Sequence, residues 1–170
     1  MAEIEIDSSA FDRISLHDVR VYALLFQRQE QQGNLILDID YIAEWPCKED
    51  AERSFLVAPA TLTFSDVVDL QIHLDWGDGS IYEKQPHGVI SCPSGELIIN
   101  DFTRSSYTDP LYADGPRPYF QYELTFWEPE GSRISLGAKD FKIVSRQVPV
   151  RTKEQTLEPA QRTPLICGGS

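Results

Sequence analysis

A strict two-residue alternation over residues 35–45 constrains the fold of this chain more than any other feature. In the segment LILDIDYIAEW, one face carries the apolar and aromatic residues Leu35, Leu37, Ile39, Tyr41, Ala43 and Trp45. The other face carries Ile36, Asp38, Asp40, Ile42 and Glu44. Successive side chains of a β-strand point to opposite faces, and a helix would mix these two sets. The alternation therefore predicts a long strand with one side in a core and an acidic side in water.

Most of the remaining chain also reads as short strands separated by turns. Segments that alternate, or that are rich in β-branched and aromatic residues, cover 19–28, 55–64, 68–76, 87–92, 96–102, 119–127, 132–136 and 139–146. In 68–76 the odd positions, including Asp69, are polar and the even ones, including Trp76, are predicted to point inward. Pro59 indicates an edge or a bulge in 55–64. No stretch keeps helical periodicity over ten residues. The prediction is a mainly β fold, an antiparallel β-sandwich or partly closed barrel with little helix.

The chain length favours one domain. With 170 residues, the chain is long enough to bury a core without disulfides. We expect a single β-rich domain over residues 1–147. Residues 148–170 form a proline-containing tail, which is predicted to be poorly ordered unless Leu157, Leu165 or Ile166 docks on the domain.

The charge is strongly negative and unevenly distributed. The net charge is −12, and residues 38–83 hold eleven acidic residues against two basic ones. Such a field repels nucleic acid and anionic membranes, and it attracts a basic protein or a cation. A simpler interpretation is that the charge keeps a β-rich protein in solution.

The cysteine pattern argues against a disulfide framework. Cys47, Cys92 and Cys167 are few and odd in number, and none has a partner at zinc-site spacing. Free thiols are typical of a reducing compartment. The N-terminus lacks an apolar signal region, and the longest apolar run, 22–26, is far too short to cross a bilayer. We therefore expect a cytoplasmic protein.

Motifs for catalysis are missing from the sequence. It contains no GxSxG elbow and no glycine-rich phosphate loop, so no catalytic residue and no cofactor is predicted. The pair His17-Asp18 before the strand at 19–28 is interpreted as a turn cap. Asp38, Asp40 and Glu44 could converge with Asp69, His73 and Asp75 on a divalent cation, but only if their two strands are neighbours.

Four segments together resemble a group of uncharacterised, small, β-rich bacterial proteins with a domain of unknown function. These segments are HDVRVYALLF, LILDIDYIAEW, APATLTFSDVVDL and ISLGAKDFKIVSRQVPVRTKEQTL, within residues 17 to about 162. The resemblance implies a bacterial cytosolic domain and no assigned activity. The opening, an HD pair followed by a strand, a loop and LxLxID, is also similar to immunity proteins of bacterial toxin systems. That likeness implies a protein that binds and blocks a toxin, often through an acidic surface.

The sequence leads to three functional hypotheses. The first is a non-enzymatic acidic domain that binds a basic protein, with Asp38, Asp40, Glu44, Asp69 and Asp75 on the contact surface. The second is a metal-dependent hydrolase that uses His73 with strand carboxylates such as Asp75. The third is a homo-oligomeric module that pairs through an edge strand such as 55–64.

Overall fold

The strands of the chain form one large antiparallel sheet. The computed structural model describes residues 3–29, 32–47, 53–76, 80–84, 88–92, 95–109, 118–163 and 165. The strands are β1 (Glu5–Asp7), β2 (Arg20–Gln29), β3 (Gln32–Glu44), β4 (Phe55–Ser65), β5 (Val68–Asp75), β6 (Ser80–Lys84), β7 (Gly88–Ser91), β8 (Leu97–Ser106), β9 (Phe120–Glu128), β10 (Arg133–Ala138), β11 (Asp140–Ser145) and β12 (Val150–Thr152). Two short 3₁₀ helices are η1 (Ser8–Arg13) and η2 (Pro159–Gln161). The predicted mainly β, antiparallel fold with little helix is confirmed.

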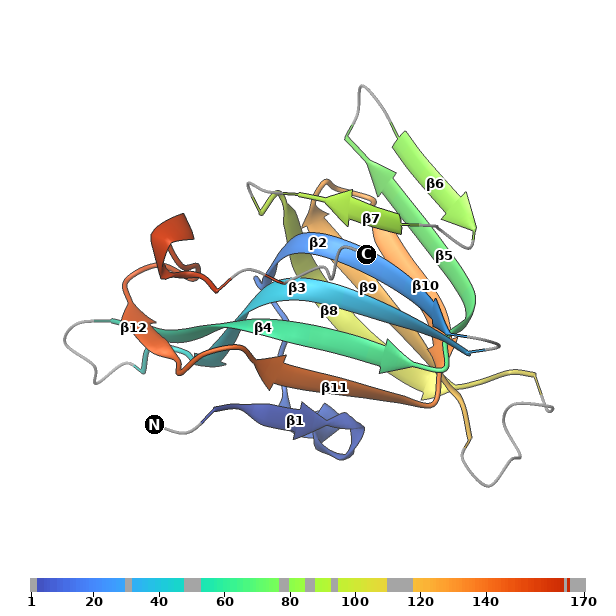
Figure 1. The fold of residues 1–170 in the computed structure, drawn as a ribbon, viewed down its shortest axis with the longest axis horizontal. Coiled ribbons are helices and arrows are strands. Elements are labelled where there is room, and N and C mark those ends of the chain that lie inside the picture. Colours follow the sequence, from blue (N-terminus) through green and yellow to red (C-terminus); the bar gives the residue numbers. More distant parts are fainter. Residues whose placement is uncertain are drawn as a thin grey trace.

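The sheet bends over itself into two layers. Its order is β1-β11-β4-β3-β2-β8-β9-β10-β5-β6, with β12 added to β4 and β7 added to β2. In Figure 1, β1, β11, β4, β3 and β2 form the front layer, and β8, β9, β10 and β5 lie behind them. The two layers join at a corner between β2 and β8. These strands pair only at their first residues, through Arg20↔Ile98 and Val21↔Leu97, and then separate into different layers. The two ends of this order, β1 and β6, do not pair, so the barrel stays open.

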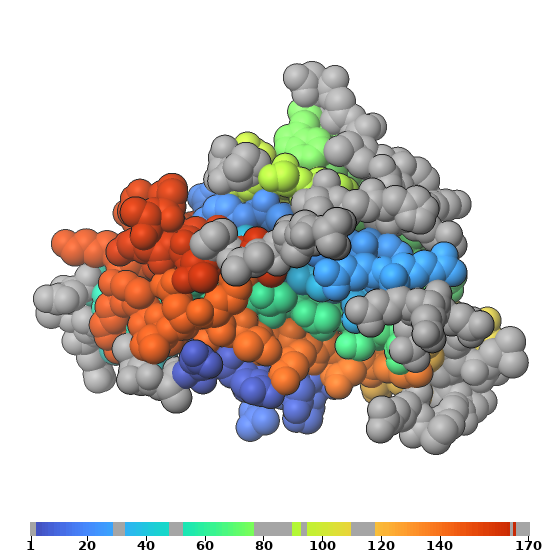
Figure 2. Space-filling view, in the orientation of Figure 1, coloured from blue at the N-terminus to red at the C-terminus, as the bar shows by residue number. Residues whose placement is uncertain are grey.

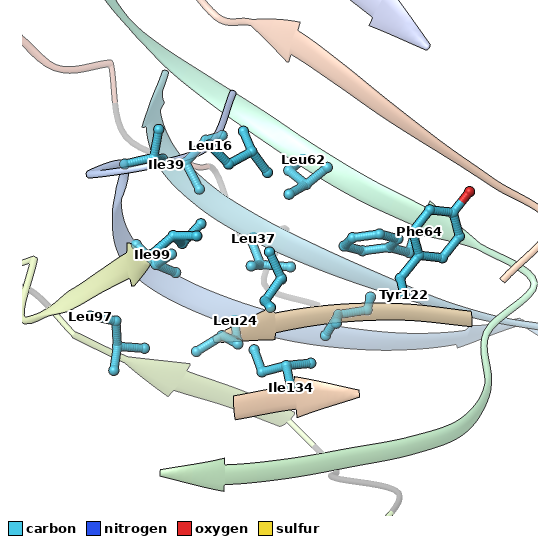
Figure 3. Close-up of a cluster of buried hydrophobic side chains, with 14 of the residues drawn as sticks. Leu16, Leu24, Leu37, Ile39, Leu62, Phe64, Leu97, Ile99, Tyr122 and Ile134 are labelled. Atoms are coloured by element: carbon cyan, nitrogen blue, oxygen red, sulfur yellow. The ribbon is translucent and has the colours of Figure 1, made fainter. Parts of the chain in front are cut away.

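The core fills the space between the two layers. Alternate residues of β3, β5 and β9 point into it, as the two-residue pattern predicts, and Leu37, Leu62 and Ile134 are fully buried there (Figure 3). Aromatic rings interlock in the same core: the centroids of Phe64 and Tyr122 lie 5.3 Å apart. Each fully buried side chain of this size contributes about 1.5–3 kcal/mol, so this core is the main source of stability.

Strand β4 corrects one prediction about edges. The segment 55–64 was expected to contain an edge or a bulge at Pro59 and to be available for pairing with another copy. In the structure β3 pairs with one side of β4, and β11 followed by β12 pairs with the other. Pro59 lies where β11 gives way to β12, and its carbonyl accepts a hydrogen bond from Arg146 N at 2.8 Å. The interior strand tolerates proline because its missing N–H falls at this junction.

Residues 146–163, which we call the C-terminal segment, cross the outer face of the front layer. The segment contains β12 and η2, and its orange and red side chains cover part of the sheet in Figure 2. Leu157 is buried, and its backbone N–H donates a hydrogen bond to Asp40 Oδ2 on β3 at 2.9 Å. In the structure this segment packs on the sheet through Leu157 and Arg162. No helix within the described residues is both long and apolar enough to cross a membrane.

Candidate protein-binding surface

The predicted acidic surface of β3 is not open to water. Asp38 and Asp40 do point away from the core, as the alternation requires, but they are only 5% and 0% exposed. The prediction that they face solvent was wrong, because the C-terminal segment covers this face. Glu44 alone among the three is exposed, and it pairs with Arg151 Nη2 at 3.0 Å.

Two arginines of the C-terminal segment neutralise the buried carboxylates. Arg162 Nε donates to Asp40 Oδ1 at 2.7 Å, and Arg162 Nη2 donates to Asp38 Oδ1 at 2.9 Å. Arg146 Nη2 pairs with the same oxygen of Asp38. Two guanidinium groups thus balance two carboxylates. Buried charges persist only when they are paired and hydrogen-bonded in this way.

Neutral groups complete the surroundings of Asp40. Its Oδ2 accepts hydrogen bonds from the Tyr22 hydroxyl at 3.0 Å and from Leu157 N at 2.9 Å. The Arg162 guanidinium lies 3.5 Å from the centre of the Tyr22 ring.

Burial lowers the pKa of Arg162, but its hydrogen bond to Asp40 and the charges of Asp40 and Asp38 outweigh burial, so the pKa of Arg162 is raised overall. Burial, followed by the Asp40 charge, raises the pKa of Tyr22. This network fastens the C-terminal segment to β3, which makes it a structural feature.

The carboxylates of β5 do not converge with those of β3. In the sheet order, β2, β8, β9 and β10 separate the two strands, so the condition for a shared cation site is not met. Asp69 is exposed, and His73 and Asp75 are half-buried on β5. Within the described ranges, no three His, Cys, Asp or Glu side chains are grouped so that they could hold a metal ion.

A row of aromatic rings lies on the surface where the two layers join. In spatial order it consists of Phe55, Trp45, His17 and Trp127, and we call it the aromatic row. The ring centroid of Trp45 lies 5.6 Å from the ring centroid of Phe55 and 6.5 Å from that of His17. His17 in turn lies 6.0 Å from Trp127. Trp45 is 42% exposed and Trp127 is 52% exposed. The side chain of His17 between them is 47% exposed.

The ends of several strands bring these rings together. Trp45 follows the last residue of β3, and Trp127 is the second-to-last residue of β9. His17 precedes β2, and the backbone next to it is anchored because Asp18 N donates to Ile99 O at 2.8 Å. Asp18 adopts a left-handed backbone with φ of 62°. Its carboxylate lies 3.2 Å from His17 Nδ1 and also accepts a hydrogen bond from Gln155 Nε2 at 3.1 Å. These contacts hold the imidazole between the two tryptophans.

Each exposed ring of the row has an acidic neighbour in the chain. Asp18 follows His17, Glu44 precedes Trp45, and Glu128 follows Trp127. Glu44 and Glu128 are exposed. The surface therefore combines large aromatic rings with a rim of three carboxylates, of which Glu44 pairs with Arg151.

The ring geometry distinguishes between types of ligand. Planes of neighbouring rings meet at 69° for Trp45 and Phe55, 54° for His17 and Trp45, and 85° for His17 and Trp127. A platform for stacking successive bases needs ring faces that flat groups can cover. Because two of these ring pairs meet edge to face and the third is tilted, the rings form no single flat platform, and exposed tryptophans are instead typical of protein interfaces.

Sequence reasoning missed the aromatic row. Alternation alone placed Trp45 and Trp76 in the core, but both are exposed. A signal was present, since the three tryptophans 45, 76 and 127 all stand within one residue of the last residue of a strand. An alternating pattern no longer dictates the direction of a side chain where the strand ends. Glu44 is the one predicted contact residue that lies beside the row.

The chain matches no protein-family model, and no curated protein and no solved structure is significantly similar to it.

Proposed function

We propose that this protein is a non-enzymatic binding domain that recognises another protein through the aromatic row and its acidic rim. The observation that carries the proposal is the run of exposed rings Trp45, His17 and Trp127, which the half-buried Phe55 extends at one end. The two tryptophans that flank it, Trp45 and Trp127, are 42% and 52% exposed. Tryptophan is enriched among the few residues that dominate binding energy at protein interfaces. Exposed apolar groups gathered in one patch mark interaction sites more reliably than scattered ones.

The charge of the surface supports a basic partner. Asp18, Glu44 and Glu128 border the rings, and the whole chain carries a net charge of −12. Complementary charge at the rim of an interface steers association and mainly raises the association rate. Binding should therefore weaken as salt increases, because exposed charges are screened.

An immunity-type role, in which the partner is a basic toxin, is one form of this proposal. It draws on the likeness of the N-terminal opening to immunity proteins of bacterial toxin systems. A bacterial cytoplasmic setting is part of the same proposal. Both Cys47 and Cys92 are free thiols, which is the state that a reducing compartment maintains.

Affinity capture with matched variants tests the proposal. The immobilised protein is exposed to proteins from its native cell, and the bound fraction is compared with that of Trp45→Ala/Trp127→Ala. The control is Trp76→Ala, which removes a tryptophan of similar exposure, 37%, from the end of β5. We expect a basic partner that binds the wild type and the control but not the double variant.

Two results would overturn the proposal. One is a partner that binds the double variant as well as it binds the wild type. The other is a complex whose affinity is the same at low and high ionic strength, which contradicts the electrostatic part of the argument. Circular dichroism of each variant verifies that the sheet is intact.

The hydrolase and oligomer hypotheses have less support. His73 and Asp75 lie on β5, apart from the carboxylates of β3 that were to join them. The segment 55–64 is paired on both sides. No observation favours either function over protein binding.

A further inference from the structure

A polar cavity lies on the outer face of the back layer, away from the aromatic row. It has a volume of about 480 Å³, and the residues that line it include Asp69, Gln71, Tyr107, Gln121 and Ser135. Clefts of this size are typical of sites for small molecules. The side chains come from β5, β10 and β9, on the face opposite the core, and from Tyr107 just after β8.

The ring of Tyr107 occupies space that is free only because residue 137 is a glycine. A Cβ atom at Gly137 would overlap the Tyr107 ring and approach Val68 Cγ2 to 2.7 Å. The ring therefore lies directly on the β10 backbone, at a point where the pairing of β10 with β5 shifts register between Ser135 and Gly137. Tyr107 is buried, so the cavity has one rigid aromatic wall.

Asp69 is held in an unusual conformation on the other side of the cavity. Its φ of 51° lies in the left-handed region, which non-glycine residues adopt at a cost. Its Oδ2 accepts a hydrogen bond from the Tyr107 hydroxyl. Backbone strain of this kind concentrates at functional sites. The strain and the hydrogen bond together fix a carboxylate at the cavity.

The remaining polar groups are also pre-arranged. Gln121 Nε2 donates to Ser135 Oγ at 2.9 Å, and Gln71 stands opposite Ser135 on the neighbouring strand. Amide and hydroxyl groups both donate and accept hydrogen bonds, which suits a ligand with several hydroxyl groups.

The charge of the cavity indicates the sign of the ligand. Asp69 is the charged residue among the described residues that line the cavity, and no ion pair within that part of the chain includes it. The protein as a whole is acidic, which repels anions.

We propose that this cavity binds a small hydroxylated organic cation, such as an amino sugar. The ammonium group pairs with Asp69, and the hydroxyl groups bond to the amides of Gln71 and Gln121 and to the Ser135 hydroxyl. The site is independent of the aromatic row, and its test does not depend on any protein partner.

Three sugars of nearly the same shape and different charge test the proposal. Glucosamine, glucose and glucuronate are titrated into ¹⁵N-labelled protein at about pH 6, well below the usual pKa of an amine. We expect affinity to fall in that order, and we expect glucosamine to shift the side-chain amide signals of Gln71 and Gln121. Equal affinities for glucosamine and glucose would overturn the proposal, as would unmoved amide signals at saturating glucosamine.

Variants identify the carboxylate that is responsible. Asp69→Asn keeps the shape and tolerates a left-handed backbone, so the fold should persist. It should weaken glucosamine binding by about tenfold or more, the loss expected for one charge-assisted hydrogen bond, and leave glucose binding nearly unchanged. Asp101→Asn removes the same charge from an exposed position on β8 and should change neither affinity. An equal loss in both variants would mean that only net charge matters and would contradict the proposal.

Discussion

Replacing Arg162 by methionine removes the guanidinium that bridges Asp38 and Asp40 and keeps most of the apolar length of the side chain. Arg162 is 11% exposed, and it makes hydrogen bonds of 2.7 Å to Asp40 and 2.9 Å to Asp38. Removal of one partner from a buried ion pair costs about 3–5 kcal/mol, because the other charge stays buried. Asp38 keeps Arg146, and Asp40 keeps two neutral donors. We therefore expect a loss near the lower limit, about 3 kcal/mol.

Arg151→Met is the matched control. It removes the same type of side chain from the same C-terminal segment, and its partner Glu44 is also a carboxylate. The difference is burial, since both side chains of this pair are 56% exposed. Exposed ion pairs contribute about 0–1 kcal/mol, so the control should be close to the wild type.

Urea unfolding followed by circular dichroism measures both losses. A domain of this size has a stability of about 5–15 kcal/mol, so a loss of 3 kcal/mol moves the midpoint clearly. The difference between the variants should persist in high salt, because buried pairs are poorly screened. If Arg162→Met loses no more than Arg151→Met, the conclusion that the C-terminal segment is fastened through its buried charges is refuted.

Three further predictions concern single groups. Burial and the Asp40 charge raise the pKa of Tyr22 above its ordinary value of 10.0, so the neutral form stabilises the fold at neutral pH and this contribution is lost as pH rises above about 10. In urea unfolding at about pH 8 and about pH 11, Tyr22→Phe should therefore lose less stability between the two conditions than the wild type. Burial raises the pKa of the Cys92 thiol to about 11. In a variant whose other cysteines are replaced by serine, Cys92 should react with a thiol reagent at about pH 8 only after the protein unfolds. Rapid reaction of Cys92 in the native protein would be inconsistent with the structure. Gly137→Ala should lower the unfolding free energy by about 1–3 kcal/mol, because its Cβ overlaps the Tyr107 ring, and an unchanged thermal midpoint would argue against that packing.

The two-residue pattern predicted the fold class and the core. On β3 the residues Leu35, Leu37 and Ile39 are all buried in the core, as expected. The same periodicity separates Leu70 and Ile72 from Asp69 on β5. Period two depends only on local backbone geometry, which is why one sequence is enough to find it.

The pattern could not predict what covers the second face of a strand. Asp38 and Asp40 were assigned to water because carboxylates are rarely buried without a partner. Their partners, Arg146 and Arg162, follow more than a hundred residues later in the chain. Only the tertiary fold brings Leu157 and these arginines over β3. Arg146 ends the predicted strand 139–146, and Arg162 lies in the proline-containing tail, where no periodic signal indicates a partner.

The candidate surface was missed for a related reason. The aromatic row is assembled from the ends of β3, β4 and β9 and from His17, three residues before the start of β2. Strand order and the corner between β2 and β8 bring these ends together, and neither follows from local pattern. Glu44 was predicted because its own strand was recognised.

Protection of the tryptophans in a complex with the captured partner tests the proposed surface most directly. A Trp76→Phe variant retains only Trp45 and Trp127, and acrylamide quenching of its fluorescence reports how accessible these two rings are. The account predicts that the partner shields both rings and that added salt removes the shielding. If the rings are quenched equally with and without saturating partner, the partner binds elsewhere and the aromatic row is not the contact surface.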